Sequence, residues 1–299
     1  MIKLSKVQTC LVLVWAVSLL VGWRPLFATF ALAWNNDEYT QILLILPVSA
    51  ALIYLEWRAL REMAAIDIRA GSIILALAAL ITCFCFVLGP SLGSSVLLFV
   101  SMFALVSWWI GAFVLCFGLR SSRVALFPLL ILFGLVPIPQ SAIDVLVFQL
   151  QQGSAWAATV LFSVFGVPAL RDGTFITIPG LELVVAKECS SIRSSSMLLV
   201  TTMVLAQLLL RSPWRKALVI CLSVPLSIAK NGLRIFTIAM LSTRVDPGYM
   251  TGRLHHQGGI VFFLIALLCV FALLWILRKG DNSPARTIPS PVEVATAKS

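Results

Sequence analysis

Residues 72–89 read SIILALAALITCFCFVLG, a run without a single charged side chain. A run of this length can cross the hydrocarbon core of a bilayer as an α-helix. Comparable apolar segments lie near residues 7–23, 41–56, 95–118, 124–138, 194–210, 217–241 and 258–277. The pattern predicts an all-α polytopic membrane protein with about eight transmembrane helices.

The composition of the 299-residue chain agrees with that class. Hydrophobic residues make up 60% of the chain, charged residues make up 11%, and the mean hydropathy is +1.03. A soluble protein of this length could not bury so much apolar side chain. In such a protein the net charge of +10 indicates basic loops retained on the cytoplasmic side. We therefore expect membrane lipid as a partner, and no nucleic acid.

The placement of basic residues predicts the orientation in the membrane. If the N-terminus is cytoplasmic, the connections on that side carry Arg58, Arg61, Arg69, Arg120, Arg123, Arg211, Arg215, Lys216, Arg278 and Lys279. The opposite side then receives Asn35-Asn36-Asp37-Glu38, in agreement with the positive-inside rule. We expect an integral domain over residues 1–279 of a multi-pass inner-membrane protein, with both termini cytoplasmic. Residues 280–299, rich in proline and poor in apolar residues, predict a disordered cytoplasmic tail.

The long connection over residues 139–193 differs from the others. Ser141 to Phe165 mixes polar and apolar residues, and a crossing there would move the basic residues 211–216 outside. An interfacial amphipathic helix is therefore favoured for this part. Residues 173–185 alternate β-forming side chains around Pro179-Gly180, which predicts a small β-hairpin. Both elements would lie on the outer face.

Cys189 follows this predicted hairpin within a polar stretch, whereas the other six cysteines lie in apolar runs. A thiol that reaches water near cations is reactive, and a helix N-terminus favours the thiolate form. Arg193 is about one helical turn away and could share a face with Cys189. Glu188 is a candidate carboxylate for the site, or simply an ion-pair partner of Lys187 or Arg193. Cys189 is thus the candidate nucleophile.

Two further polar insertions fall at the same predicted depth. Lys230-Asn231-Gly232-Leu233-Arg234 interrupts an apolar segment, and a charged residue at the centre of a membrane helix costs about 2.5–3.5 kcal/mol. Such residues face a polar cavity or snorkel to the interface. His255 and His256 precede the last apolar segment. Together these groups suggest one outer cavity that holds a thiol nucleophile, an imidazole base and a cation for an oxyanion.

These three segments, in this order, resemble the exosortase/archaeosortase family of membrane cysteine transpeptidases. The family pattern has a Glu-Cys-Ser-Gly-Ile-like motif, then Asn-x-x-Arg, then His-x-x-x-Gly. This chain has Glu188-Cys189-Ser190-Ser191-Ile192, Asn231-Gly232-Leu233-Arg234 and His255-His256-Gln257-Gly258-Gly259. The last spacing selects His255 over His256. Residues 34–62 also look like the family's early Trp–acidic–Tyr segment, and Pro137-Ile138-Pro139 looks like its pre-catalytic region.

Two positions depart from the family pattern. Ser191 replaces the motif glycine beside the nucleophile, and Gln41 stands where many members have a histidine.

The resemblance implies a substrate: a secreted protein with a C-terminal sorting signal made of a short motif, a transmembrane helix and a basic tail. Cys189 would attack the peptide bond outside the membrane, His255 would act as general base and then acid, and Arg234 would stabilise the oxyanion or orient the thiolate. Supporting or substrate-binding roles would fall to Glu188, Arg193, Asn231, Lys230 and His256. The chemistry needs no metal or organic cofactor.

Two alternatives stay open from the residues. A non-enzymatic transporter or ligand-binding membrane protein would use Lys230 and Arg234 to recognise an anionic ligand. A thiol redox protein is disfavoured, because Cys189 has no nearby resolving cysteine.

Overall fold

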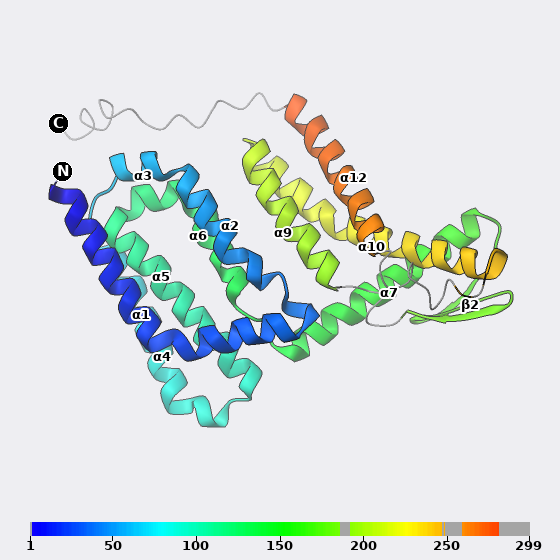
Figure 1. Ribbon diagram of the computed structural model, residues 1–299, viewed down its shortest axis with the longest axis horizontal. Helices are drawn as coiled ribbons and strands as arrows, with labels where there is room; N and C mark the ends of the chain where they lie inside the picture. The colour runs from blue at the N-terminus through cyan, green and yellow to red at the C-terminus, as the bar shows by residue number, and fades with distance from the viewer. Residues whose placement is uncertain (1, 186–191, 247, 249–258, 281–299) are drawn as a thin grey trace. The chain divides into compact units, whose positions relative to one another are not determined.

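The computed structural model describes residues 2–185, 192–246, 248 and 259–280 (Figure 1). Within these ranges, eight segments are long and apolar enough to cross a membrane. They contain the helices α1 (Ile2–Asn35), α2 (Ile42–Leu55), α4 (Ile68–Leu88), α5 (Ser94–Val124), α7 (Gln140–Val164), α9 (Ile192–Leu209), α10 (Pro213–Arg244) and α12 (Gly259–Lys279). The predicted class of all-α multi-pass membrane protein is confirmed.

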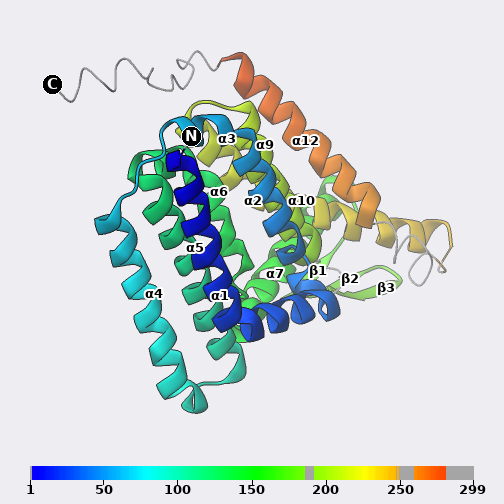
Figure 2. The ribbon, with the colours of Figure 1, turned by 60° about the vertical axis from the view of Figure 1, so that its left-hand side comes forward.

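The chain divides into two compact units, Met1–Ala142 and Ile143–Ser299. In the first unit, α5 packs against both α1 and α4 (Figure 2). A Cβ atom on Gly71 of α4 would lie 2.4 Å from Leu115 Cβ of α5, so only glycine permits this close approach. Gly118 has a φ of 79° and interrupts α5 near its end.

One crossing expected from the sequence is corrected by the structure. Residues 124–138 form only the short helix α6 (Leu126–Ile131) and the 3₁₀-helix η3 (Leu132–Leu135). Apolar composition alone suggested a full span, but the run Pro137-Ile138-Pro139 follows soon after and prevents the helix from continuing. The two pieces pack against α2, where Ser49 Oγ donates a hydrogen bond to the Pro128 carbonyl oxygen at 2.7 Å. The small remaining helices of this unit are η1 (Asp37–Tyr39), α3 (Trp57–Glu62) and η2 (Gly89–Ser91).

In the second unit, α9, α10 and α12 pack against one another around a buried apolar cluster. The cluster comprises Leu198, Ala206, Leu210, Val219, Ala266, Val270 and Leu274. Consecutive helices run in opposite directions, so α9 and α12 begin at the same end of this group (Figure 1). α10 is the longest of the three and extends beyond that end toward the sheet.

The predicted hairpin is present as part of a three-stranded antiparallel sheet in the order β1-β2-β3. The strands are β1 (Leu170–Asp172), β2 (Phe175–Ile178) and β3 (Leu181–Val184). Gly173 and Gly180 have φ values of 59° and 83° and form the two tight turns. Ile176 and Leu183 are paired across the strands, and they pack in a second apolar cluster with Phe162 of α7 and Ala239 of α10.

The segment predicted to be interfacial, Ser141 to Phe165, forms the 25-residue helix α7. By length and composition it is also one of the eight candidate membrane spans. Figure 1 shows that α7 runs across the direction of α9 and α12. Its interfacial location stays a prediction, as do the sidedness of the termini and the domain limits at residues 279 and 280.

Candidate functional site

The buried face of α10 is polar in its middle. Lys230 is 5% exposed, Asn231 1% and Arg234 8%. Ser223 and Ser227 continue the same face and are also buried, because residues four or seven apart lie on one side of a helix. Away from this face, the first half of α10 carries exposed apolar residues, among them Leu218 and Leu222. In a bilayer, this arrangement shields the polar groups from lipid and marks them as functional candidates.

Two hydrogen bonds join this polar face to the first turn of α9. The ammonium group of Lys230 donates a hydrogen bond to Ser194 Oγ, and Ser227 Oγ donates one to Ser195 Oγ at 2.6 Å. In an apolar environment the alternative to such bonds is an unsatisfied buried polar group. The start of α9 is therefore held against the middle of α10.

Small residues bring α7 against α10 at the same level. A Cβ atom on Gly232 would lie 2.5 Å from Ala157 Cβ and 3.0 Å from the Ala157 carbonyl carbon, so the two helices touch here with no room for a side chain. One helical turn away along α10, Ile228 packs over Gly153. Gly232, which interrupts the apolar pattern in the sequence, thus has a structural role: it sets the distance between α7 and α10.

The polar residues lie between two apolar clusters. Leu226 contacts the cluster of α9, α10 and α12, whereas Ile235 and Phe236 contact the cluster beneath the sheet. The Phe236 ring lies with its centroid 5.1 Å from that of Phe162 on α7. Both flanks of the polar stretch are therefore fixed by packing, which fixes the rotation of α10 about its axis.

The last residue described before Cys189 is also anchored. Val185 is 2% exposed, its N–H donates to the Thr174 carbonyl oxygen at 3.0 Å, and its own carbonyl oxygen accepts from Gln151 Nε2 at 2.8 Å. Gln151 belongs to α7 and is itself buried. The chain is thus held by α7 and by the sheet up to four residues before Cys189.

Four of the predicted site residues lie outside the residues that the structure describes. Cys189 and Glu188 fall in residues 186–191, and His255 and His256 fall in residues 249–258. Their neighbours are described: α9 begins three residues after Cys189, and α12 begins four residues after His255. These two helices begin at the same end of their group (Figure 1).

Arg193 differs in burial from the two cations of α10. Arg193 lies in the first turn of α9 and is exposed, whereas Lys230 and Arg234 are buried on α10. The predicted pairing of Arg193 with the thiol of Cys189 stays a prediction. The expected disordered tail over residues 280–299 also lies outside the described residues, apart from Gly280.

A second polar cluster occurs in the first unit. Tyr39 is buried, and its hydroxyl donates to the Ile138 carbonyl oxygen at 2.8 Å and lies 3.2 Å from Gln140 Oε1. Gln140 Nε2 in turn donates to Glu38 Oε2 at 3.0 Å. The structure thereby joins the acidic–Tyr segment to the region of Pro137-Ile138-Pro139.

Sequence reasoning missed Gln151, Gln140 and Ser227 as positioning residues. Gln151 and Ser227 are polar residues inside long apolar or amphipathic segments, and that interruption was the available signal. Among the described residues, no group of three His, Cys, Asp or Glu side chains could hold a metal ion. The buried cations can instead bind an anion or stabilise negative charge that develops on a reacting oxygen.

Residues 34–272 match the family model described as transmembrane exosortase (Exosortase_EpsH). Comparison with the curated proteins and with the solved structures gave no match.

Proposed function

The chain belongs to the transmembrane exosortase family, and from this premise we propose that it is a membrane cysteine peptidase or transpeptidase that processes C-terminal sorting signals. The substrate is a secreted protein that ends in a short motif, a transmembrane helix and a basic tail. Cleavage takes place at the outer face of the inner membrane. The observation that carries the proposal is the buried cationic face of α10, which includes the Asn231 and Arg234 of the family pattern.

The proposed reaction begins at Cys189. Its thiolate attacks the carbonyl carbon of the scissile peptide bond, and the resulting oxyanion is stabilised by the Arg234 guanidinium. The imidazolium of His255 protonates the leaving nitrogen, the C–N bond breaks, and a thioester remains on Cys189. Water or an amine then attacks the thioester while His255 accepts its proton, which releases a carboxylate or a new amide and restores the thiolate.

Burial supports the assignment to Arg234. A guanidinium is charged at all relevant pH values, and it acts on an oxyanion more strongly in a site that excludes water. Arg234 is 8% exposed and lies one turn beyond Lys230 on the same helix. The packing of Gly232 against Ala157 keeps this face of α10 in a fixed orientation, which is what a preorganised oxyanion stabiliser requires.

Lys230 supports the site indirectly in this proposal. Its hydrogen bond with Ser194 holds the first turn of α9, and Gln151 holds Val185 on the other side of residues 186–191. One end of residues 186–191 is thereby attached to α10, which carries Arg234, and the other end is attached to α7. We assign Lys230, Ser194 and Gln151 as positioning residues.

The test is processing of a candidate substrate in cells. A secreted protein with such a signal, tagged on both sides of its motif, is co-expressed with the chain, and the new C-terminus is determined by mass spectrometry. Cys189→Ala should leave the substrate uncleaved on an immunoblot, whereas Cys221→Ala, which changes an exposed cysteine of α10, should process it normally. Normal processing by Cys189→Ala would refute the nucleophile assignment.

The same buried cations favour the second candidate, recognition of an anionic ligand without catalysis. In that case Cys189→Ala would leave the function of the protein intact, and Arg234→Ala would abolish uptake or binding. If the cleavage product is found in cells with the wild-type protein and is absent from cells with Cys189→Ala, this alternative is excluded.

A further inference from the structure

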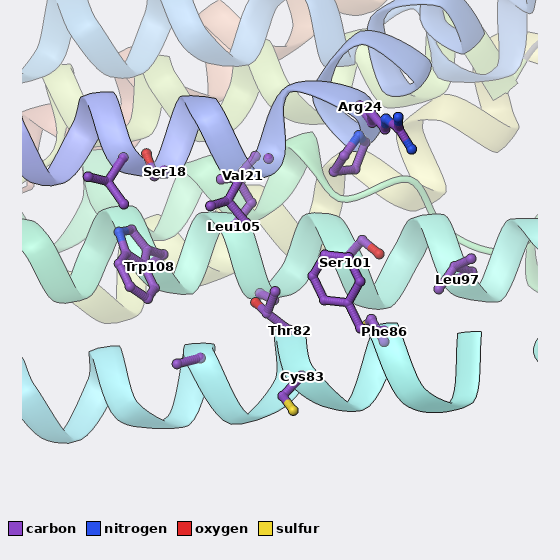
Figure 3. A pocket seen from close by; sticks show the side chains of 16 residues that line it. Ser18, Val21, Arg24, Thr82, Cys83, Phe86, Leu97, Ser101, Leu105 and Trp108 are labelled. Carbon is purple, nitrogen blue, oxygen red and sulfur yellow. The ribbon is translucent and has the colours of Figure 1, made fainter. Parts of the chain in front are cut away.

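The first unit contains a cavity of about 550 Å³ between α1, α4 and α5 (Figure 3). This volume falls within the range of pockets that bind small organic ligands. Apolar side chains form most of its wall, including Val21 of α1, Phe86 of α4 and Leu105 of α5. None of these residues belongs to the site proposed above.

The hydroxyl groups of Ser18 and Thr82 in the wall form hydrogen bonds within the protein. Ser18 Oγ donates to the Trp15 carbonyl oxygen at 2.7 Å and accepts from Trp109 Nε1 at 2.8 Å. Thr82 Oγ1 donates to the Ala78 carbonyl oxygen at 2.8 Å. Both hydroxyl groups therefore form hydrogen bonds with groups of α1, α5 and α4, and these parts of the wall present mainly carbon atoms to a ligand.

Arg24 is the one charged side chain among the residues that line the cavity. Figure 3 shows it on α1, toward the end of the cavity where Leu97 and Ser101 of α5 lie, while Trp108 and Ser18 lie toward the other end. Pro25 follows it inside α1. The cavity thus pairs an elongated apolar wall with a single cation at one end.

We propose that this cavity binds a phospholipid, with an acyl chain along the apolar wall and the phosphate on the Arg24 guanidinium. A guanidinium binds a phosphate through paired charge-assisted hydrogen bonds. Net negative lipids are further favoured by the charge itself, so phosphatidylglycerol is the probe of choice. The inference is independent of the proposed function.

Size argues against a transmembrane helix as the occupant. A helix with its side chains is about 10 Å across, and a bilayer-spanning one is about 30 Å long. Such a cylinder has several times the volume of the cavity, which is about 550 Å³. A lipid chain, which is narrow and flexible, suits an elongated cavity of this size.

The experiment measures lipid retention by native mass spectrometry of the full chain. The detergent-purified protein is mixed with equal amounts of phosphatidylglycerol and of a diacylglycerol with the same acyl chains, which lacks the phosphate. We expect one phosphatidylglycerol bound per chain and at least tenfold less diacylglycerol. Failure to retain phosphatidylglycerol, or equal retention of the two lipids, would overturn the proposal.

Two variants with matched controls locate the site. Arg24→Gln should reduce retention of phosphatidylglycerol about tenfold, whereas Arg69→Gln, an exposed arginine in the first turn of α4, should not. Ala79→Phe fills the cavity from α4 and should abolish retention, while Ala76→Phe changes an exposed alanine of α4 that does not line the cavity and should be neutral. If Ala79→Phe retains the lipid, the cavity is not its site.

A second measurement covers the case in which Arg24→Gln or Ala79→Phe fails to fold. A photoactivatable phosphatidylglycerol, with the reactive group in its acyl chain, is crosslinked to the wild-type protein. Labelled peptides should come from the cavity wall on α1, α4 and α5. Labelling spread over the other apolar helices, with no enrichment in the wall, would contradict a specific site.

Discussion

Lys230 on α10 donates a hydrogen bond to Ser194 Oγ in the first turn of α9, five residues after Cys189. This bond connects a buried cation to the helix that follows the proposed nucleophile. It also explains how a basic residue is accommodated in an apolar segment: Lys230 faces α9 rather than lipid.

Lys230→Met should keep the fold and lose most of the activity. An apolar residue of similar size is tolerated where a buried charge has been, but α9 loses its link to α10. Loss of a hydrogen bond to a charged group, about 1.5–3 kcal/mol, corresponds to a decrease in kcat/KM of roughly 10- to 100-fold. The assay is cleavage of a tagged substrate in purified membranes.

The matched control is Lys216→Met. Lys216 lies in the first turn of α10 and donates to Gln207 Oε1 of α9 at 2.8 Å, so it also joins α9 to α10. We expect the kcat/KM of Lys216→Met to stay within about twofold of the wild-type value. An equal loss in both variants would mean that Lys230 contributes only general stability.

Arg234→Ala should reduce kcat by about 10²- to 10³-fold, the usual cost of removing an oxyanion donor. Arg234→Lys should recover part of this loss, because it keeps the charge but not the geometry of the guanidinium. Arg244→Ala, at the exposed end of the same helix, serves as the control. If Arg234→Ala raises KM and leaves kcat unchanged, Arg234 binds the substrate and does not stabilise the oxyanion.

Gln151→Leu should loosen the chain next to the nucleophile segment. The variant leaves the buried Val185 carbonyl without its 2.8 Å hydrogen bond, which costs about 1–3 kcal/mol. Hydrogen exchange of the β2–β3 peptides should then be faster, and cleavage slower. Gln152→Leu changes a half-buried neighbour and should alter neither. Unchanged exchange in Gln151→Leu would exclude the anchoring role.

Gly232→Ala should destabilise the second unit. The added Cβ would lie 2.5 Å from Ala157 Cβ and 3.0 Å from backbone atoms of α7, so the helices must separate at a cost of about 1–3 kcal/mol. In a mixed detergent titration, this variant should unfold at a lower fraction of denaturing detergent than the wild type. Gly93→Ala has no atom within 4 Å of the new methyl group and should match wild type. Equal stability of the two variants would show that α7 and α10 do not require this close contact.

The fold was largely predictable because a bilayer imposes a simple rule on sequence. The apolar run at 72–89 appears as α4 (Ile68–Leu88), since a membrane helix must satisfy its own backbone. Residues 124–138 were predicted wrongly, because hydropathy does not register that Pro137 and Pro139 prevent a helix from continuing. The third strand, β1, was missed because three residues carry too little periodic signal.

The sequence predicted which types of residue form the site, but it did not predict which residues contact one another. The insertion cost of a charge indicated that Lys230 would avoid lipid, and it is 5% exposed. Its partner Ser194 could not be foreseen, because the relative rotation of α9 and α10 depends on packing such as that of Gly232 on Ala157. The same holds for Tyr39 and Ile138, which are 99 positions apart in the sequence and share a hydrogen bond.

The most direct test of the central claim is detection of the thioester on Cys189. Purified enzyme is mixed with a tagged substrate, quenched with acid during turnover, and digested for peptide mass spectrometry. The account predicts that the peptide containing Cys189 carries the N-terminal fragment of the substrate, and that neutral hydroxylamine removes it. Substrate cleavage with no adduct on Cys189, together with unchanged cleavage by Cys189→Ala, would contradict the account.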